Sequence, residues 1–323
     1  MSFSINKKFD VNYNDVFFGL ANYSFDLSVY DLFGAFLAGA TLVLPEEQHI
    51  QNPEYWKVLI EKHNISIWNS VPAQMQMLYE NLKMNKTNVS SLKVALLSGD
   101  WIPVPLAKGI LNDYPHIKLV SLGGATECSI WSIYYPINAV RKGQRSIPYG
   151  KPLANQYFYV LDQNLEECPD YVPGKLYIAG KGLGKEYINA PELTSKKFLY
   201  HEKIGKRLYD TGDMGRYLSD GDIEILGRED NQIKIHGHRI EIGEIEGALI
   251  QNPDIQSATV VKYSEGDLDI KLAAFAQLLL YNKSNYSDSN QRIAEKCKNI
   301  IDENTKSIDK NILERWIELA DGV

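Results

Sequence analysis

Two short apolar runs in the first half of the chain decide the fold class: KVALLSG at residues 93–99 and IKLVSLGG at residues 117–124. Each run is short, apolar and closed by glycine, as is typical of a buried β-strand. Two other stretches, VYDLFGAFLAG at 29–39 and PEYWKVLIEKH at 53–63, carry apolar residues at helical spacing. This alternation of strand-like and helix-like segments predicts an α/β layer architecture.

From about Ile147 onward the chain changes character. Short strand-like runs are separated by turns of glycine and aspartate. They are KLYIAG at 175–180, RLYDTGD at 207–213, GDIEILG at 221–227 and QIKIHG at 232–237. This pattern predicts a small β-rich subdomain.

A small α+β unit is predicted to begin near Asp230. Residues 241–250 have the pattern of a short amphipathic helix, and SATVVKY at 257–263 and LAAFAQLLLY at 272–281 resemble strands. The polar stretch NKSNYSDSNQ at 282–291 has the composition of a linker.

Beyond this linker, apolar residues recur at helical spacing and predict two further helices. These residues are Ile293, Cys297, Ile300, Ile312, Leu313, Trp316, Ile317 and Ala320. We therefore divide the chain into residues 1–229, part of a large core, 230–281, the start of a small lobe, and 282–323, a linker with helices.

The composition excludes several classes of function. The chain has 323 residues, 44% of them hydrophobic, and a net charge of -7 without a basic stripe, so nucleic acid is not an expected partner. The longest apolar stretch, Leu272 to Tyr281, is too short to cross a bilayer, and we expect a cytoplasmic protein. The three cysteines, Cys128, Cys168 and Cys297, lack the spacing of a zinc site or a disulfide framework.

The first chemical motif is SLGGATECSIW at residues 121–131. A Gly-Gly turn after a strand lets the backbone approach a nucleotide closely. Thr126 can then hydrogen-bond a phosphate, and Glu127 can hold Mg²⁺ through hard oxygen ligands. Taken alone, the motif could equally be a surface turn with a solvated glutamate.

A second pair of candidates lies in RLYDTGDMGRYLSDGDIEILGRED at residues 207–230, where Asp213 and Arg228 each follow a strand at a turn. A carboxylate suits the hydroxyls of a ribose, and a guanidinium suits a phosphate or the nucleotide sugar. Each residue also has an ordinary alternative. Asp213 could be a turn residue, and Arg228 could pair with Glu229 or Asp230 at the surface.

The order and spacing of five motifs indicate a family. The motifs are SFDLSVYDLFG at 24–34, GGATE at 123–127, GKLYIAGKGLGKEYINAPELTSKKF at 174–198, RLYDTGD at 207–213 and GREDNQIKIHGHRIEIGEIE at 227–246. With these motifs the chain resembles an adenylation domain of a nonribosomal peptide synthetase, a member of the adenylate-forming enzymes. The resemblance runs from about Phe9 to Phe275 and implies the α/β adenylate-forming fold.

The resemblance implies a two-step ligase. ATP and an amino acid form aminoacyl-AMP and pyrophosphate, and the phosphopantetheine thiol of a peptidyl carrier protein then takes the acyl group. Neighbouring synthetase domains are further implied partners. Thr126 and Glu127 match the catalytic phosphate and Mg²⁺ contacts, and Gly124, Asp213 and Arg228 match the nucleotide contacts. Asp230 matches the hinge between the two lobes, and Gly237 matches a loop of the thiol tunnel.

The resemblance also implies a substrate pocket. Asp26 matches the carboxylate that pairs with the substrate's α-ammonium, a charge-assisted contact. By itself Asp26 could equally cap the following helix. The other matching positions are Leu27, Tyr30, Asn69, Leu96, Ser98, Leu122, Ile130 and Trp131.

Read in order with Asp26, these positions give D-L-Y-N-L-S-L-I-W, which is similar to the family's signature for cysteine. Bulky Tyr30 and Trp131 would close a small pocket, and Asn69 and Ser98 would offer polar partners to a thiol. One methylene is worth only about 1–3 kcal/mol, so serine and other small amino acids remain competitors. The surrounding motifs resemble synthetases that build thiazoline or thiazole rings, as in siderophore and toxin assembly lines.

Two segments of the family pattern have no match. No Gly/Ser/Thr-rich phosphate loop precedes Phe9, and no segment with the catalytic lysine follows Phe275, a role that Lys234 does not fit. We therefore expect little or no adenylation by the chain alone. ERWIELADGV at 314–323 resembles the lead-in to an inserted domain, and a truncated or frameshifted gene is the alternative.

Two alternative functions stay open. An acyl-CoA ligase of the same superfamily is one, although Asp26 argues against it because a fatty acid has no ammonium group. The other is a catalytically inactive fragment that serves as a binding module or needs a partner chain.

Overall fold

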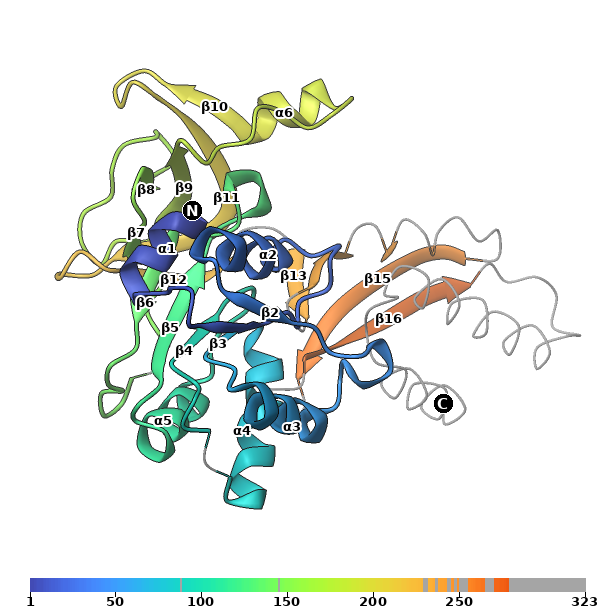
Figure 1. Cartoon of the computed structure of the whole chain (residues 1–323). Helices are drawn as coiled ribbons and strands as arrows, with labels where there is room; N and C mark the ends of the chain where they lie inside the picture. The colour runs from blue at the N-terminus through green and yellow to red at the C-terminus, as the bar shows by residue number, and fades with distance from the viewer. Residues whose placement is uncertain are drawn as a thin grey trace, which may run out of the picture. The chain divides into compact units, whose positions relative to one another are not determined.

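The structure of the chain is a computed structural model, and it describes residues 1–87, 89–144, 146–228, 232–235, 238–242, 245–246, 249, 255–264 and 270–278. The chain divides into two compact units, Met1–Asp230 and Asn231–Val323 (Figure 1). The predicted hinge residue Asp230, Gly237 and the predicted tail helices lie outside the described residues. The functional division into 1–229, 230–281 and 282–323 stays a prediction.

A seven-stranded sheet forms the centre of the first unit, in the order β2-β1-β3-β4-β5-β6-β7. Its strands are β1 (Val16–Phe18), β2 (Thr41–Val43), β3 (Ile67–Ser70), β4 (Val94–Leu97), β5 (Lys118–Gly123), β6 (Ile133–Pro136) and β7 (Lys151–Pro152). The first five strands pair in parallel, and β6 and β7 pair antiparallel. The two apolar runs are β4 and β5, which confirms their prediction as strands.

Five helices accompany this sheet: α1 (Ser2–Phe9), α2 (Leu27–Ala38), α3 (Pro53–His63), α4 (Pro72–Asn85) and α5 (Val104–Asp113). The start of α3 is encoded locally, because the Asn52 side chain accepts from the backbone N–H groups of Glu54 and Tyr55 and Pro53 occupies the first turn. The predicted helices at 29–39 and 53–63 are confirmed as α2 and α3. Helix α1 was not predicted, although it buries Ile5 and Phe9.

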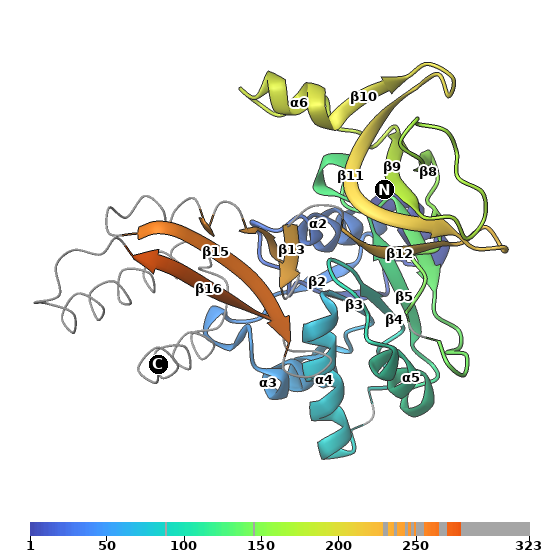
Figure 2. The same cartoon turned by 180° about the vertical axis from the view of Figure 1, so that it is seen from behind.

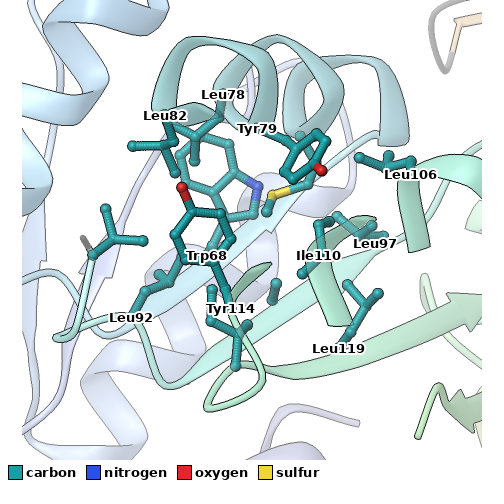
Figure 3. Close-up of a cluster of buried hydrophobic side chains, with 14 of the residues drawn as sticks. Trp68, Leu78, Tyr79, Leu82, Leu92, Leu97, Leu106, Ile110, Tyr114 and Leu119 are labelled. Atoms are coloured by element: carbon teal, nitrogen blue, oxygen red, sulfur yellow. The ribbon is translucent and has the colours of Figure 1, made fainter. Parts of the chain in front are cut away.

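The helices cover both faces of the sheet, with α1 and α2 on one side and α3, α4 and α5 on the other (Figure 1). Successive side chains of a strand point to opposite faces, so each buried strand supplies both layers. The layer beside α3–α5 is the larger core, shown in Figure 3 with Trp68 of β3, Leu97 of β4 and Leu119 of β5. The layer beside α1 and α2 receives Ile67, Leu96 and Leu122 from the same strands.

An antiparallel five-stranded sheet forms the β-rich part of the first unit. Its strands are β8 (Gln156–Leu161), β9 (Gly174–Gly180), β10 (Phe198–His201), β11 (Lys206–Tyr217) and β12 (Ile223–Arg228), with α6 (Pro191–Lys197) before β10. The order is β10-β11-β9-β8, and β12 pairs with β11. Figure 2 shows the long, bent β11 beside β9 and β12. The predicted β-rich subdomain is therefore present, but Gln232–Ile235 of the predicted run QIKIHG form β13 in a separate sheet of the second unit.

The second unit contains two antiparallel hairpins in its described part, β13 (Gln232–Ile235) with β14 (His238–Glu241) and β15 (Ile255–Ser264) with β16 (Ile270–Leu278). Glu241 ends β14 instead of beginning a helix, and helical conformation is described at residues 242, 245, 246 and 249. Across the described residues of both units, no helix has the length and apolar character needed to cross a membrane.

Candidate functional site

The Gly-Gly turn at the end of β5 is shaped by close packing. A Cβ atom at Gly123 would lie 1.7 Å from a ring carbon of Tyr149. Gly124 has φ +153°, and a Cβ there would lie 2.4 Å from the carbonyl oxygen of Ile130. Only glycine fits at either position without displacing its neighbours. The turn continues into a short 3-10 helix, η2 (Thr126–Cys128).

The turn stays unusual after η2. Ser129 and Ile130 both have positive φ, 66° and 71°. This conformation is costly for a β-branched residue such as Ile130, on the order of 1–3 kcal/mol. A strained backbone of this kind persists only where the surrounding structure stabilises it. Here the strained backbone directs the side chains of Ile130 and Trp131 into the core beside α2.

A second motif packs against this turn from residues 181–187. The Ser129 hydroxyl donates to the Gly182 carbonyl at 2.8 Å, and the Gly184 N–H donates to the Glu127 carbonyl at 2.7 Å. The Tyr187 hydroxyl donates to Glu127 Oε1 at 2.7 Å. Glu127 is therefore half-buried and held in one position, unlike the solvated surface glutamate that the turn alone would allow.

Thr126 and Asp26 meet although 100 positions separate them in sequence: Thr126 Oγ1 donates to Asp26 Oδ2 at 2.6 Å. Asp26 precedes α2, but its side chain makes no capping hydrogen bond. The helix-cap interpretation of Asp26 is therefore not supported. Its carboxylate lies instead at the point where α2 meets the Thr-Glu turn.

The side chains predicted to form the substrate pocket gather beside α2, on the sheet face that α1 and α2 cover. Those that are buried are Leu27, Tyr30, Asn69, Leu96, Ser98, Leu122, Ile130 and Trp131, and Asp26 is half-buried. The rings of Tyr30 and Trp131 are 5.0 Å apart between centroids. Period-two alternation explains the gathering, because Asn69 and Leu96 are paired neighbours on β3 and β4.

Hydrogen bonds fix the polar members of this group. Trp131 Nε1 donates to Ser98 Oγ at 3.0 Å, and the Tyr30 hydroxyl donates to Asn6 Oδ1 at 3.0 Å. Asn69 Nδ2 donates to the Leu27 carbonyl at 3.1 Å and to Asp31 Oδ1 at 2.8 Å. Sequence reasoning missed Asn6, which precedes all the matched motifs, and Asp31, which lies in the SFDLSVYDLFG motif but is not one of the matched pocket positions.

Asp213 and Arg228 are direct partners across the β11–β12 pairing, with Arg228 Nη1 3.0 Å from Asp213 Oδ1. Their side chains are 15% and 14% exposed, so the pair is mostly buried. The prediction that both residues follow a strand at a turn is wrong. Arg228 is the last residue of β12, and Asp213 also lies inside a strand. It lies within β11, because the strand passes Gly212 with a register irregularity and continues to Tyr217.

Tyr149, which sequence reasoning also missed, connects the two sheets of the site. Burial raises the pKa of its hydroxyl, the nearby charge of Asp213 raises it further, and a hydrogen bond with the Gly124 backbone lowers it. Its ring lies against Gly123 at the end of β5 and packs edge-on against Phe158 of β8, with the ring centroids 5.8 Å apart. The sequence gives little indication of this role for Tyr149, because the only related feature is Gly123, the glycine that leaves room for its ring.

Comparison with known proteins identifies the family. Residues 1–188 match the family described as AMP-binding enzyme. The chain belongs to the AMP-binding enzyme family. The predicted α/β adenylate-forming fold is confirmed as well, because this AMP-binding chain superposes on a solved peptide synthetase, FmoA3 in an α-methyl-L-serine-AMP bound form. The TM-score is 0.69 at 39% identity, over 71% of this chain and 26% of that one.

Two curated relatives of this AMP-binding enzyme are peptide synthetases. Bacitracin synthase 1 of Bacillus licheniformis is 47% identical over 271 residues, 84% of this chain and 5% of the relative. Pyochelin synthetase PchF of Pseudomonas aeruginosa is 46% identical over 275 residues, 85% of this chain and 15% of the relative. The resemblance to nonribosomal peptide synthetases is confirmed, and the chain spans only a small part of these relatives.

Proposed function

We propose that this chain is part of an adenylation domain that activates cysteine. In the proposed reaction, the amino-acid carboxylate attacks the α-phosphorus of ATP, pyrophosphate leaves, and aminoacyl-AMP forms. The acyl group then passes to the phosphopantetheine thiol of a peptidyl carrier protein, with release of AMP. The product would enter nonribosomal peptide synthesis of the siderophore or thiazoline type.

The observation that carries the proposal is the contact between Asp26 and Thr126. In an α-amino acid, the ammonium and carboxylate groups are separated by a single carbon atom. An ammonium group held by Asp26 would therefore bring its carboxylate next to the residue that is proposed to contact phosphate. Adenylation requires this adjacency, because the two reactants must be held in attack geometry.

The residues present fit a nucleotide with Mg²⁺. Gly124 allows the backbone of residues 130–132 to pack against its Cα, which holds the turn that leads to Thr126 in place. Asp213, held in place by Arg228, offers carboxylate oxygens to a ribose, and Glu127, held by Tyr187, offers oxygen ligands to a hard cation. When bound, the metal would neutralise charge on the transferring phosphoryl group.

Cysteine is proposed from the D-L-Y-N-L-S-L-I-W string and from the small, buried set of side chains that carry it. Serine is the closest competitor, since it has the same length and also carries a side-chain donor. The FmoA3 structure holds α-methyl-L-serine-AMP, which makes the comparison with serine necessary.

Binding of stable aminoacyl-adenylate analogues tests the proposal directly. The chain would be titrated calorimetrically with the cysteinyl, seryl and alanyl sulfamoyladenosines. We expect the cysteinyl analogue to bind tightest. Equal or tighter binding of the seryl or alanyl analogue would refute cysteine as the substrate, and failure of all three to bind would refute adenylation.

The Asp26→Ala variant tests the ammonium contact in the same titration. Loss of the only proposed anionic partner should weaken every analogue by at least about tenfold, because a desolvated ammonium group is left unpaired. Glu61→Ala, which removes an exposed carboxylate from α3, is the matched control and should bind as the parent chain does. Unchanged binding in Asp26→Ala would show that the ammonium lies elsewhere.

A further inference from the structure

Asn69 is one of the most buried polar side chains of the first unit, with 1% of its surface exposed. Its amide nitrogen has two protons, and both are engaged, by the Leu27 carbonyl at 3.1 Å and by Asp31 Oδ1 at 2.8 Å. Its amide oxygen has no hydrogen-bond partner among the described residues. A buried acceptor left in this state costs about 1–3 kcal/mol, so its retention calls for an explanation.

The two acceptors that hold Asn69 come from one face of α2. Leu27 and Asp31 are four positions apart, and residues at this spacing lie one above the other on a helix. Asp31 is itself 2% exposed. Burial raises the pKa of its carboxyl to about 8, with the hydrogen bonds from Asn69 and from the Ala21 backbone acting in the opposite direction.

The two acceptors decide which way the amide of Asn69 points. If the amide were flipped, its oxygen would face the Leu27 carbonyl, which cannot donate, and the present hydrogen bond from Nδ2 to Asp31 Oδ1 would be lost. The nitrogen end is therefore fixed toward α2, and the oxygen end is fixed away from these acceptors. Without Asp31, one of the two contacts that oppose the flip would be missing.

We propose that Asp31 is a positioning residue for substrate selection, which holds the amide of Asn69 so that its oxygen accepts a hydrogen bond from the substrate's side chain. This inference rests on the proposed function, which places Asn69 in the substrate pocket. The ligand class is a small α-amino acid with an S–H or O–H donor on its β-carbon.

Asn69 fits this task better than Ser98, another polar residue of the group. Ser98 Oγ already accepts the indole N–H of Trp131 at 3.0 Å. Asn69 Oδ1, in contrast, is an acceptor inside a buried layer with no partner from the described residues. A substrate with a side-chain donor would satisfy this oxygen, and alanine would leave it unsatisfied.

The test is the ratio of affinities for the cysteinyl and alanyl sulfamoyladenosines, measured by calorimetry in three forms of the full chain. The parent chain should prefer the cysteinyl analogue by about tenfold, the value expected for one satisfied buried acceptor. Asp31→Ala should reduce this ratio to within about twofold of one while the alanyl affinity stays unchanged. Asp31→Asn keeps a carbonyl that can accept from Asn69 Nδ2, so it should keep the ratio.

The seryl analogue distinguishes the two donors, since a larger seryl-to-alanyl ratio than cysteinyl-to-alanyl ratio would assign the site to a hydroxyl. An unchanged cysteinyl-to-alanyl ratio in folded Asp31→Ala would overturn the role of Asp31. If that variant does not fold, Asn69→Ala decides, because an unchanged ratio there would mean that the positioned oxygen is not used. Absence of binding by every analogue to the parent chain would instead overturn the proposed function.

Discussion

The two sides of the candidate site are built in opposite ways. The amino-acid side, made of the buried group around Tyr30, Asn69 and Trp131, uses neutral hydrogen bonds within one face of one sheet. The nucleotide side joins the Gly-Gly turn to the charged pair of Asp213 and Arg228 on a second sheet. Discrimination between small side chains needs fixed groups in a dry layer, whereas phosphate and sugar need charged groups and bare backbone.

The largest effect is expected from Gly124→Ala on the nucleotide side. The added Cβ would meet the Ile130 carbonyl at 2.4 Å and occupy φ +153°. Strain of about 3 kcal/mol at the turn should weaken all three analogues by about 100-fold and to the same extent. The control is Gly205→Ala, at φ +65° with no atom within 4 Å of the new Cβ, which should leave binding unchanged.

Equally weakened binding of all three analogues would support the separation of the two sides, because a defect on the nucleotide side should not depend on the side chain of the bound amino acid. A selective loss of the cysteinyl analogue in Gly124→Ala would contradict it. Such a result would mean that the turn also shapes the amino-acid side through Ile130.

On the amino-acid side, the buried carboxyl of Asp31 should make the free energy of unfolding depend on pH. The folded pKa of Asp31 is about 8, and the ordinary value is 3.8, so between these values the folded chain holds a proton that the unfolded chain has lost. Stability should therefore fall as pH rises through this window, by up to about 1.4 kcal/mol per pH unit. Urea unfolding of the parent chain and Asp31→Asn at pH 5, 6 and 7 measures this slope, which the variant should lack.

A smaller effect is expected from Ser98→Ala, which leaves the Trp131 indole N–H buried without its acceptor. The free energy of unfolding should fall by about 1–2 kcal/mol. In the double variant Ser98→Ala with Trp131→Phe, the donor is removed as well, so the two losses should be less than additive. Strict additivity in denaturant melts would show that this hydrogen bond contributes little.

The smallest effect is expected at Tyr187→Phe, which removes the hydroxyl that donates to Glu127 Oε1 at 2.7 Å. The Mg²⁺ concentration for half-maximal binding of a non-hydrolysable ATP analogue should rise about fivefold, because the carboxylate is less well held. Tyr200→Phe, an exposed position on β10, is the control and should not change it. If this Mg²⁺ concentration rose equally in both variants, Tyr187 would have no specific role in holding Glu127 for the metal.

Much of the fold was predictable from local pattern. The strands β4 and β5 and the helices α2 and α3 follow from apolar spacing and from caps such as Asn52, which act within a few residues. Helix α1 was not predicted because it contains few apolar residues. Asn6 is a polar residue whose burial follows only from its hydrogen bond with Tyr30, which lies 24 positions away in the sequence. The prediction of a turn at Asp213 was wrong because a glycine such as Gly212 can shift the register of a strand without ending the strand.

The sequence by itself determined the motifs, their order and the residue types that suit a nucleotide and a small amino acid. Only the tertiary structure decided which residues meet: Thr126 with Asp26, Asn69 with Asp31, and Tyr149 with Gly123. The physical reason is the sequence separation over which each interaction acts. Strand and helix patterns arise from neighbours within a few positions, whereas a hydrogen bond between residues 100 positions apart depends on which strands pair and which face each side chain takes.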